Sequence, residues 1–309
     1  MEKIRADLLQ KLKREMEKND ISFFENVPMS RYTSFKAGGN AAILVEAQDT
    51  HRLKTILALT AQEKVPHILL GNGSNTLFKD GGYEGVVIKL SQDFAGVSVA
   101  EDGVTVTAGA AVLLSALAKT LMSKGLTGFE FAGGIPGSLG GALFMNAGAY
   151  GGEMKQVVKS VRAVSPDGAE EKVFSSDEME FGYRHSALEE NGYIAVEAVL
   201  SLEKGDVEEI AARMKELAAK RNSKQPVNYP SAGSTFKRPE GHFAGKLIED
   251  AGLKGVAVGG AQVSTLHSVF IINKGDATAT DIIQLIALVQ NRVYDEFGVM
   301  LKPEVRIIG

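Results

Sequence analysis

A hydroxyl and an ammonium group stand three residues apart in the run Ser234-Thr235-Phe236-Lys237. This S-x-x-K spacing occurs in enzymes whose serine is acylated while the lysine helps to remove its proton. A serine hydroxyl can also hand a proton to a carbanion, or it can merely close a turn after Gly233. The run by itself leaves these three interpretations open.

The residues after Lys237 argue against acylation. That mechanism needs the serine and the lysine one turn apart on the same face of a helix. Pro239 follows two residues after Lys237, and it disfavours both a continuing helix and a helical Arg238. The companion strings S-D-N and K-T-G are absent from the sequence. We therefore expect Ser234 to be a proton donor or a turn residue.

Two glycine-rich segments could hold phosphate groups. GNGSNT (71–76) follows the apolar run HILL, and FAGGIPGSLGGALFMNAGAYGG (131–152) contains eight glycines. Neither segment matches the dinucleotide-binding or P-loop strings. Glycine lets a backbone approach a ligand closely, although it also marks turns and tight packing. Two such segments in one chain suggest one extended, phosphate-bearing cofactor whose pyrophosphate is held by loop N–H groups.

Composition excludes several other chemistries. The sequence has no cysteine, so disulfides, thiolate metal sites and cysteine nucleophiles are excluded. Its five histidines are too dispersed for a local metal motif, and we expect no metal site. A net charge of −4 argues against broad nucleic-acid binding. The charged N-terminal segment is unlike a signal peptide, and no stretch reaches the roughly 18 apolar residues of a membrane span, so we expect a cytoplasmic protein.

The elements that must position these residues are strands mixed with helices. AAILVEA (41–47) predicts a buried strand, and Asp49 or Thr50 can cap the helix that follows. Further strands are predicted over residues 67–70, 86–90, 96–100, 104–110, 157–165, 170–175, 193–202, 268–273 and 300–309. Further helices are predicted over residues 1–20, 112–125, 206–225, 244–251 and 280–297. Turns are expected at Asp102-Gly103 and at 166–168. The chain is predicted to be α+β, with two mixed portions and a smaller C-terminal one that begins near residue 205.

Six ordered motifs carry a specific resemblance to a known family. They are TSFKAGG (33–39), GNGSNTL (71–77), GGIPGSLGGALFMNAGAYGGE (133–153), FGYRHS (181–186), AGSTFKRP (232–239) and PEVRIIG (303–309). In order and spacing, and over nearly the whole chain, they resemble UDP-N-acetylenolpyruvoylglucosamine reductase (UDP-N-acetylmuramate dehydrogenase). The compact stretch after Ser234 is similar to the shorter, type II-like form of that family.

The resemblance implies a fold. It indicates a two-subdomain FAD-binding region of the vanillyl-alcohol-oxidase / p-cresol-methylhydroxylase type, with a smaller α+β substrate-binding domain. We expect residues 1–90 to form the first FAD-binding subdomain, with 301–309 as a candidate strand completing it. Residues 91–204 then form the second subdomain and residues 205–300 the substrate domain.

The resemblance also implies a reaction and its catalytic residues. NADPH reduces a non-covalently bound FAD, which then reduces the enolpyruvyl group of UDP-N-acetylglucosamine enolpyruvate to UDP-N-acetylmuramate for the bacterial cell wall. Ser234 inherits the role of proton donor to the substrate's carbanion or enolate. Arg184 matches the catalytic arginine, whose planar fork can bind a carboxylate. Glu304 matches the catalytic glutamate, although the C-terminal run alone would favour an ion pair with Arg306.

The ligand-binding residues are carried over from the same motifs. For FAD these are Gly71, Asn72, Gly73, Ser74, Asn75, Gly134, Ile135, Pro136, Gly137, Ser138, Gly141, Asn146, Ala147 and Arg306. For the substrate diphosphate, cations near the serine motif are expected, namely Arg221, Lys224, Lys237 and Arg238.

Two alternatives stay open. One is another FAD-dependent oxidase or dehydrogenase of the same superfamily, and the other is a non-catalytic nucleotide-binding protein. Under the leading interpretation the partner is a UDP-sugar, and no nucleic acid, membrane or obligate protein partner is expected.

Overall fold

Two compact units make up the chain, which a computed structural model describes over residues 2–309. Unit 1 contains the chain through Glu25, Ile43–Asn72 and Gly85–Ala219, and unit 2 contains Asn26–Ala42, Gly73–Glu84 and Lys220–Gly309. Unit 1 has two separate apolar cores, and unit 2 has one. The domain boundaries implied by the resemblance stay a prediction.

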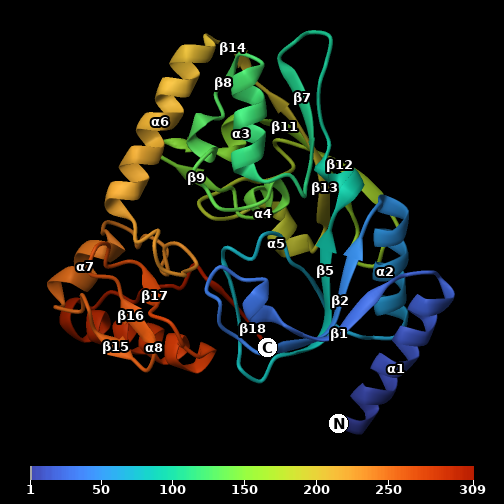
Figure 1. The fold of residues 1–309 in the computed structure, drawn as a ribbon, viewed down its shortest axis with the longest axis horizontal. Coiled ribbons are helices and arrows are strands. Elements are labelled where there is room, and N and C mark those ends of the chain that lie inside the picture. The colour runs from blue at the N-terminus through green and yellow to red at the C-terminus, as the bar shows by residue number, and fades with distance from the viewer. Residues whose placement is uncertain (1) are drawn as a thin grey trace. The chain divides into compact units, whose positions relative to one another are not determined.

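The first core of unit 1 lies between a sheet and two helices. The sheet has the order β1 (Phe23–Pro28), β2 (Asn40–Ala47), β5 (Tyr83–Leu90), β3 (His67–Leu69). Helices α1 (Glu2–Lys18) and α2 (Thr50–Gln62) lie along one side of these strands (Figure 1). Asp49 caps α2, because its Oδ1 accepts a hydrogen bond of 2.7 Å from the amide of Arg52. The predicted strand at 41–47 and the helix after it are thereby confirmed.

The second core of unit 1 is built on a five-stranded antiparallel sheet. Its order is β12 (Glu171–Ser175), β11 (Val158–Val164), β13 (Ile194–Ser201), β7 (Thr105–Gly109), β6 (Val97–Val99). Smaller elements around it are α3 (Leu114–Ser123), β8 (Leu126–Thr127), α4 (Leu139–Phe144), β9 (Gly148–Ala149), β10 (Gly152–Glu153), α5 (Ala187–Asn191) and β14 (Glu203–Lys204). Both predicted turns are present, with positive φ at Gly103 (+70°) and Gly168 (+73°).

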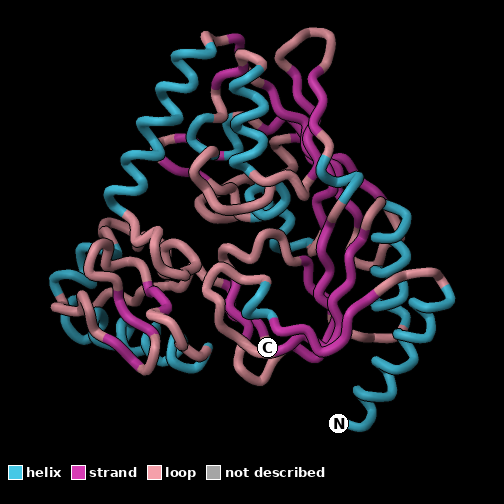
Figure 2. The backbone as a smooth tube through the Cα atoms, in the orientation of Figure 1, coloured by secondary structure: helices cyan, strands magenta, loops and turns pink. Residues whose placement is uncertain are grey.

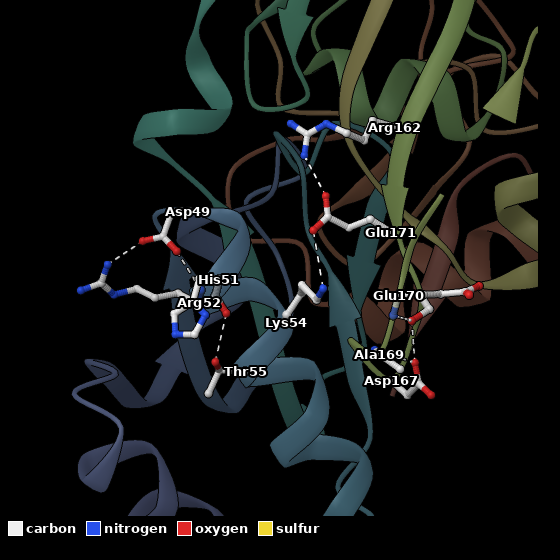
Figure 3. A network of polar contacts seen from close by, with 11 residues as sticks. Asp49, His51, Arg52, Lys54, Thr55, Arg162, Asp167, Ala169, Glu170 and Glu171 are labelled. Carbon is white, nitrogen blue, oxygen red and sulfur yellow. Dashed lines mark hydrogen bonds and ion pairs between the residues drawn. The ribbon is translucent and has the colours of Figure 1, made fainter. Parts of the chain in front are cut away.

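A polar network ties these two parts of unit 1 together (Figure 3). Glu171 of β12 accepts from Arg162 of β11 at 3.1 Å and lies 3.6 Å from the Lys54 ammonium of α2. The 166–168 turn also presses against α2, since a methyl group at Gly168 would lie 2.3 Å from the Lys54 carbonyl oxygen. Val164, Ile194 and Val196 of the second sheet enter the first core as well. We expect the two parts to behave as one body.

Unit 2 surrounds a short antiparallel sheet of β15 (Ala257–Val258), β16 (Ala261–Val263) and β17 (Ile271–Asn273). Helices α7 (Ala244–Asp250) and α8 (Ala279–Phe297) flank these strands (Figure 2). The charged helix α6 (Val207–Lys224) leads into this unit. A parallel pair, β4 (Thr76–Phe78) with β18 (Arg306–Ile308), completes it.

Two predicted strands of unit 2 are shorter than expected. The strand predicted at 268–273 begins only at Ile271, because the amide of Phe270 turns back to the carbonyl of His267. The strand predicted at 300–309 is confined to Arg306–Ile308, and Pro303, which lacks an N–H, makes only an isolated bridge. The predicted α+β class is confirmed. Among residues 2–309, no helix has both the length and the apolar character needed to cross a bilayer.

Candidate active site

Ser234 lies in a non-helical segment of unit 2 that is hydrogen-bonded on both sides. The amide of Thr235 donates to the Val269 carbonyl (2.9 Å), and the amide of Glu304 donates to the Thr235 carbonyl (2.8 Å). The Thr235 hydroxyl, 1% exposed with its side chain, accepts from the amide of Ile271 (3.1 Å). Residues 234–237 form no helix and Thr235 stands at a bend, so the shared helical face that the S-x-x-K mechanism requires is missing. Ser234 and Lys237 are therefore not arranged for acylation, as the residues after Lys237 predicted.

Gly233 makes the bend that leads into this segment. Its φ is +73°, yet a methyl group there would meet no heavy atom within 4 Å. Backbone conformation, rather than space, is the reason for glycine at this position. One interpretation of Ser234 was that its hydroxyl closes a turn. The bend is instead made at Gly233, and the half-buried Ser234 begins the segment that follows.

Glu304 is brought to the serine segment by backbone pairing. Phe236 and Pro303 form an antiparallel bridge, so the serine segment and the glutamate segment run side by side. The carbonyl of Glu304 also accepts a hydrogen bond of 3.0 Å from the side-chain amide of Asn75. The first glycine loop (71–75) is in this way joined to the glutamate segment. Ser234, Glu304 and Asn75 thus belong to one bonded framework in unit 2.

The TSFKAGG motif belongs to the same framework. The amide of Ser34 donates to the Gly73 carbonyl at 3.0 Å, and the Ser34 hydroxyl donates to the Ser231 carbonyl at 2.6 Å. A methyl group at Gly73 would lie 2.0 Å from the Tyr32 carbonyl oxygen, so only glycine fits. Unit 2 therefore assembles three of the six motifs in full and most of GNGSNTL, from three distant stretches of chain.

Arg184 lies in unit 1, in a tight turn between Gly182 and His185. The turn is closed by Gly182 N–H to His185 O (3.1 Å) and by His185 N–H to Gly182 O (3.4 Å). Arg184 has φ +53°, a region that costs a side-chain-bearing residue about 1–3 kcal/mol. Its guanidinium lies 5.2 Å from the ring centre of Tyr183, with Nη2 3.5 Å from the Gly148 carbonyl oxygen.

The second glycine loop (133–152) lies against this turn. Asn146 donates from Nδ2 to the Gly182 carbonyl (3.0 Å), and the Ser186 hydroxyl donates to the Phe144 carbonyl (2.8 Å). Asn146 and Tyr150 also have positive φ values, +43° and +54°. Strained backbone is concentrated where the glycine loop meets the arginine turn, as is common at functional sites.

The two glycine loops approach each other within unit 1 at Gly71 of the first loop and Ser138 of the second. A methyl group at Gly71 would lie 2.6 Å from the Ser138 hydroxyl oxygen. Lys89, which the motifs did not identify, donates from Nζ to the Gly71 carbonyl at 3.0 Å, and burial lowers the pKa of its ammonium group. The signal in the sequence was a lysine near the end of an otherwise apolar strand, VVIKL.

The backbone N–H groups of these loops decide whether a pyrophosphate fits. The amides of Leu139 and Gly140 are used by the fold, donating to the Val112 and Ala110 carbonyls at 2.8 Å. Among the described residues of unit 1, the amides of Gly134, Ser138 and Gly141 have no acceptor. The same holds for Gly71 and Asn72. Two facing loops with unused N–H groups fit a bound pyrophosphate.

Some predicted cofactor residues have side chains or amides that the fold already uses. Both N–H groups of the Asn146 side chain are bonded within the protein, and the amide of Ala147 donates to the Ala142 carbonyl at 2.8 Å. Asn75 likewise donates to Glu304. These residues shape the loops, and a contact with a ligand would have to come from their other atoms.

All four cations predicted to bind the diphosphate lie in unit 2, together with Ser234. Arg221 and Lys224 occupy the last turn of α6, and Arg238 lies 4.0 Å over the ring of Phe243. Burial, followed by the charge of Lys254, lowers the pKa of His267, and Lys224 contributes in the same direction. Lys224 and Lys254 therefore lie near His267, and Lys254 is also paired with Glu249 at 2.7 Å. In the described chain, no group of three or more His, Asp or Glu side chains could hold a metal ion.

Residues 41–173 match the FAD binding domain family. Residues 225–308 match the C-terminal domain of UDP-N-acetylenolpyruvoylglucosamine reductase. The chain is a flavin-dependent oxidoreductase.

Similar proteins identify the family more narrowly. The chain is 52% identical to UDP-N-acetylenolpyruvoylglucosamine reductase of Alkaliphilus oremlandii, over 91% of this chain and 92% of that protein. It is 51% identical to the reductase of Clostridioides difficile over 95% of each chain. The solved reductase of Thermus caldophilus superposes with a TM-score of 0.79 at 35% identity, covering 94% of this chain and 99% of that one. The chain belongs to the UDP-N-acetylenolpyruvoylglucosamine reductase family.

Proposed function

We propose that the chain reduces the enolpyruvyl group of UDP-N-acetylglucosamine enolpyruvate to UDP-N-acetylmuramate, with NADPH as electron donor, in peptidoglycan precursor synthesis. The observation that carries this function is the match to reductases of that name along more than nine-tenths of the chain. The substrate is a UDP-sugar. The reaction is placed in the cytoplasm, where its nucleotide substrates occur, and needs no nucleic acid, membrane or obligate protein partner.

FAD bound here would supply the hydride transfer that links NADPH to the terminal vinyl carbon of the substrate. The protein's part is to hold the cofactor through the unused N–H groups of the two glycine loops. The residues assigned to this task are Gly71, Asn72, Gly73, Ser74, Asn75, Gly134, Ile135, Pro136, Gly137, Ser138, Gly141, Asn146, Ala147 and Arg306. Lys89 fixes the carbonyl of Gly71, which keeps the first loop in register.

Three side chains then act on the substrate. Hydride addition leaves negative charge on the carbon beside the carboxylate, and Ser234 donates its hydroxyl proton to that carbon. Arg184 binds the carboxylate in a two-point fashion while the charge builds. Glu304 shares a proton with the enolic carboxyl group or orients the water that restores the serine proton.

Cations of unit 2 bind the diphosphate of the UDP-sugar. Arg221, Lys224, Lys237 and Arg238 are the assigned residues, and phosphate is the ligand that such cations bind most readily. Their position in the same unit as Ser234 supports this assignment.

Anaerobic single-turnover absorbance tests the proposal. NADPH is added to reduce the bound flavin, and then the enolpyruvyl substrate is added to wild type and to Ser234→Ala. We expect NADPH to bleach the flavin in both proteins, and substrate to restore the oxidised spectrum quickly only in wild type. Ser231→Ala is the matched control, because Ser231 takes part through its backbone carbonyl, and it should behave as wild type.

Two outcomes would contradict the proposal. Fast reoxidation in Ser234→Ala would remove the serine from the proton transfer. If the reduced wild-type flavin is not reoxidised by this substrate, the reductase function itself is wrong; rapid flavin reduction by an alcohol would then favour another oxidase or dehydrogenase. A purified chain that binds no FAD would favour a non-catalytic nucleotide-binding protein.

A further inference from the structure

The turn that carries Arg184 is fastened to the second glycine loop at two points. Before the arginine, the Gly182 carbonyl accepts from Nδ2 of Asn146 at 3.0 Å. After it, the Ser186 hydroxyl, fully buried with its side chain, donates to the Phe144 carbonyl at 2.8 Å. The two anchor points on the loop are only two residues apart, so the loop and the turn must move together.

Asn146 is the more committed of the two anchors. It is 1% exposed, and its side-chain amide makes two further bonds to residues just after the loop. Nδ2 donates to Oε2 of Glu153, and Oδ1 accepts from the amide of Lys155, both at 3.0 Å. Asparagine is also among the few side-chain-bearing residues that tolerate its φ of +43°. The burial, the hydrogen bonds and the backbone conformation of Asn146 together hold its side chain against the arginine turn.

Glu153 is itself held in place. Its carboxylate lies 3.0 Å from the ammonium group of Lys155, and its backbone amide donates to Oε1 of Gln156 at 3.1 Å. The bond to Gln156 is half of a capping box on the 3₁₀ turn Met154–Gln156, whose other half is the Gln156 amide donating to the Glu153 carboxylate. The partner that orients the Asn146 amide is therefore rigid, and the amide cannot rotate without losing several bonds.

The arginine turn needs outside support. It is closed by two hydrogen bonds of its own, and one of these is 3.4 Å long. Arg184 occupies a left-handed conformation, which is unfavourable for a residue that, unlike glycine, has a Cβ atom. A strained conformation of this kind persists only when the surroundings over-determine it. The hydrogen bond from Asn146 to the Gly182 carbonyl restrains the turn in this conformation.

We propose that Asn146 is a positioning residue for Arg184, holding the guanidinium where the substrate carboxylate binds and coupling its position to the flavin-binding loop. The proposal rests on the proposed function, in which Arg184 binds that carboxylate. Asn146 needs no contact with substrate to fill this role. A misplacement of about 1 Å in a catalytic group can cost about 100-fold in rate.

A double-mutant cycle tests the proposal. The rate of flavin reoxidation by the enolpyruvyl substrate is measured in wild type, Asn146→Ala, Arg184→Ala and the double variant. We expect Asn146→Ala to slow this step by about 10- to 100-fold in the wild-type background and to add no further slowing in the Arg184→Ala background. Equal slowing in both backgrounds, or none in wild type, would overturn the proposal.

Asn273→Ala is the matched control. Asn273 is a buried asparagine of unit 2 whose side chain donates to the Phe35 carbonyl (2.9 Å) and accepts from two amides. Its loss should lower thermal stability and leave the reoxidation rate within the range of wild type. If Asn273→Ala slows reoxidation as much as Asn146→Ala, the effect is general loosening and the positioning role fails.

A second readout does not depend on turnover. Release of the turn should expose the Arg184–His185 bond to trypsin, so cleavage there should be faster in Asn146→Ala than in wild type or Asn273→Ala.

If Asn146→Ala does not fold, Asn146→Asp keeps the shape and the acceptor for Lys155 but loses the donor to Gly182, and the same results are expected. Unchanged cleavage and rate in that variant would overturn the proposal. A wild type that cannot reduce the substrate, or an Arg184→Ala variant with full activity, instead refutes the proposed function.

Discussion

The segments that carry Ser234 and Arg184 are held in place by different means. Ser234 belongs to a segment fixed by backbone hydrogen bonds to residues 269 and 302–304, with the Thr235 hydroxyl also accepting from the amide of Ile271. Arg184 stands in a strained two-residue turn fixed from outside by the side chains of Asn146 and Ser186. Backbone pairing is available to almost any sequence, whereas the second arrangement depends on particular side chains. Substitutions beside Ser234 should therefore affect stability, and substitutions beside Arg184 should affect catalysis.

The largest effect is expected from Ser234→Ala. The serine segment keeps its backbone pairing without the hydroxyl, so substrate binding should be preserved while the proton transfer is lost. Positioned acid catalysis contributes about 10²- to 10⁴-fold. We expect flavin reoxidation to slow by that factor with little change in substrate affinity, as measured by single-turnover absorbance and by flavin difference spectra. A weakened affinity with an unchanged rate at saturation would show that the hydroxyl binds and does not react.

A smaller effect is expected from Thr235→Val. The buried Thr235 hydroxyl accepts from the amide of Ile271, which the valine would leave without an acceptor. An unsatisfied buried group costs about 1–3 kcal/mol in the free energy of unfolding. Denaturant titration should show this loss, with reoxidation kinetics close to wild type. Thr55→Val is the control, because Thr55 only donates to a carbonyl of its own helix, and equal losses in both variants would contradict the prediction.

A comparable or smaller effect is expected from Gly71→Ala. The new methyl group would lie 2.6 Å from the Ser138 hydroxyl oxygen, so this hydroxyl must move away from the place where the two glycine loops meet. We expect FAD affinity to fall about tenfold, or ~1.4 kcal/mol, measured by flavin fluorescence on titration into the apoprotein. Gly81→Ala should leave the affinity unchanged, since a methyl group at Gly81 meets nothing within 4 Å. Full affinity in Gly71→Ala would mean that the loops need not meet.

The smallest effect is expected at the hairpin turn of Asp102. This turn, like that of Arg184, is held by a side chain, but the residue with positive φ is a glycine, Gly103. Hydrogen bonds from the Thr105 hydroxyl and from the amides of Thr105 and Val104 lower the pKa of Asp102 to about 2. A carboxyl with a lowered pKa stabilises the fold above its unfolded pKa, near 4, and loses that contribution as the pH falls through the folded value. Between pH 5 and pH 2 the melting temperature of wild type should therefore fall more than that of Asp102→Asn. Parallel curves would refute this.

Local signals in the sequence predicted much of the fold. The apolar run at 41–47, the cap at Asp49 and the turn at Asp102-Gly103 depend on neighbouring residues alone, and each is found. Helix α4 was not predicted, because Gly140 and Gly141 disguise it among loop glycines. The joining of 26–42 and 73–84 to the C-terminal third in one unit also had no local signal, since it arises from pairings between distant segments.

Much of the candidate site could be assembled only from ordered motifs. These identified Ser234, Arg184 and Glu304, which individually resemble ordinary surface residues. They could not reveal that Arg184 has a positive φ, or that the Asn146 side chain donates a hydrogen bond to the arginine turn. Both depend on which loops lie against each other, and hydrogen-bond partners more than 30 residues apart leave no periodic trace in a sequence.

The pairing of β4 with β18 has a consequence for synthesis on the ribosome. The two segments joined by Asn75 and Glu304 are 229 residues apart. At about 5–20 residues per second, the earlier segment waits roughly 10–50 s for the later one. During that interval the side chains of Leu77 and Phe78, fully buried in the finished protein, have no partner strand. Unit 1 can gather most of its strands sooner, so we expect ribosome-bound chains halted before residue 306 to be cut by protease near 73–84 while β11–β13 resist. The nascent chain is thus most vulnerable to aggregation at the very strand that supports the first glycine loop.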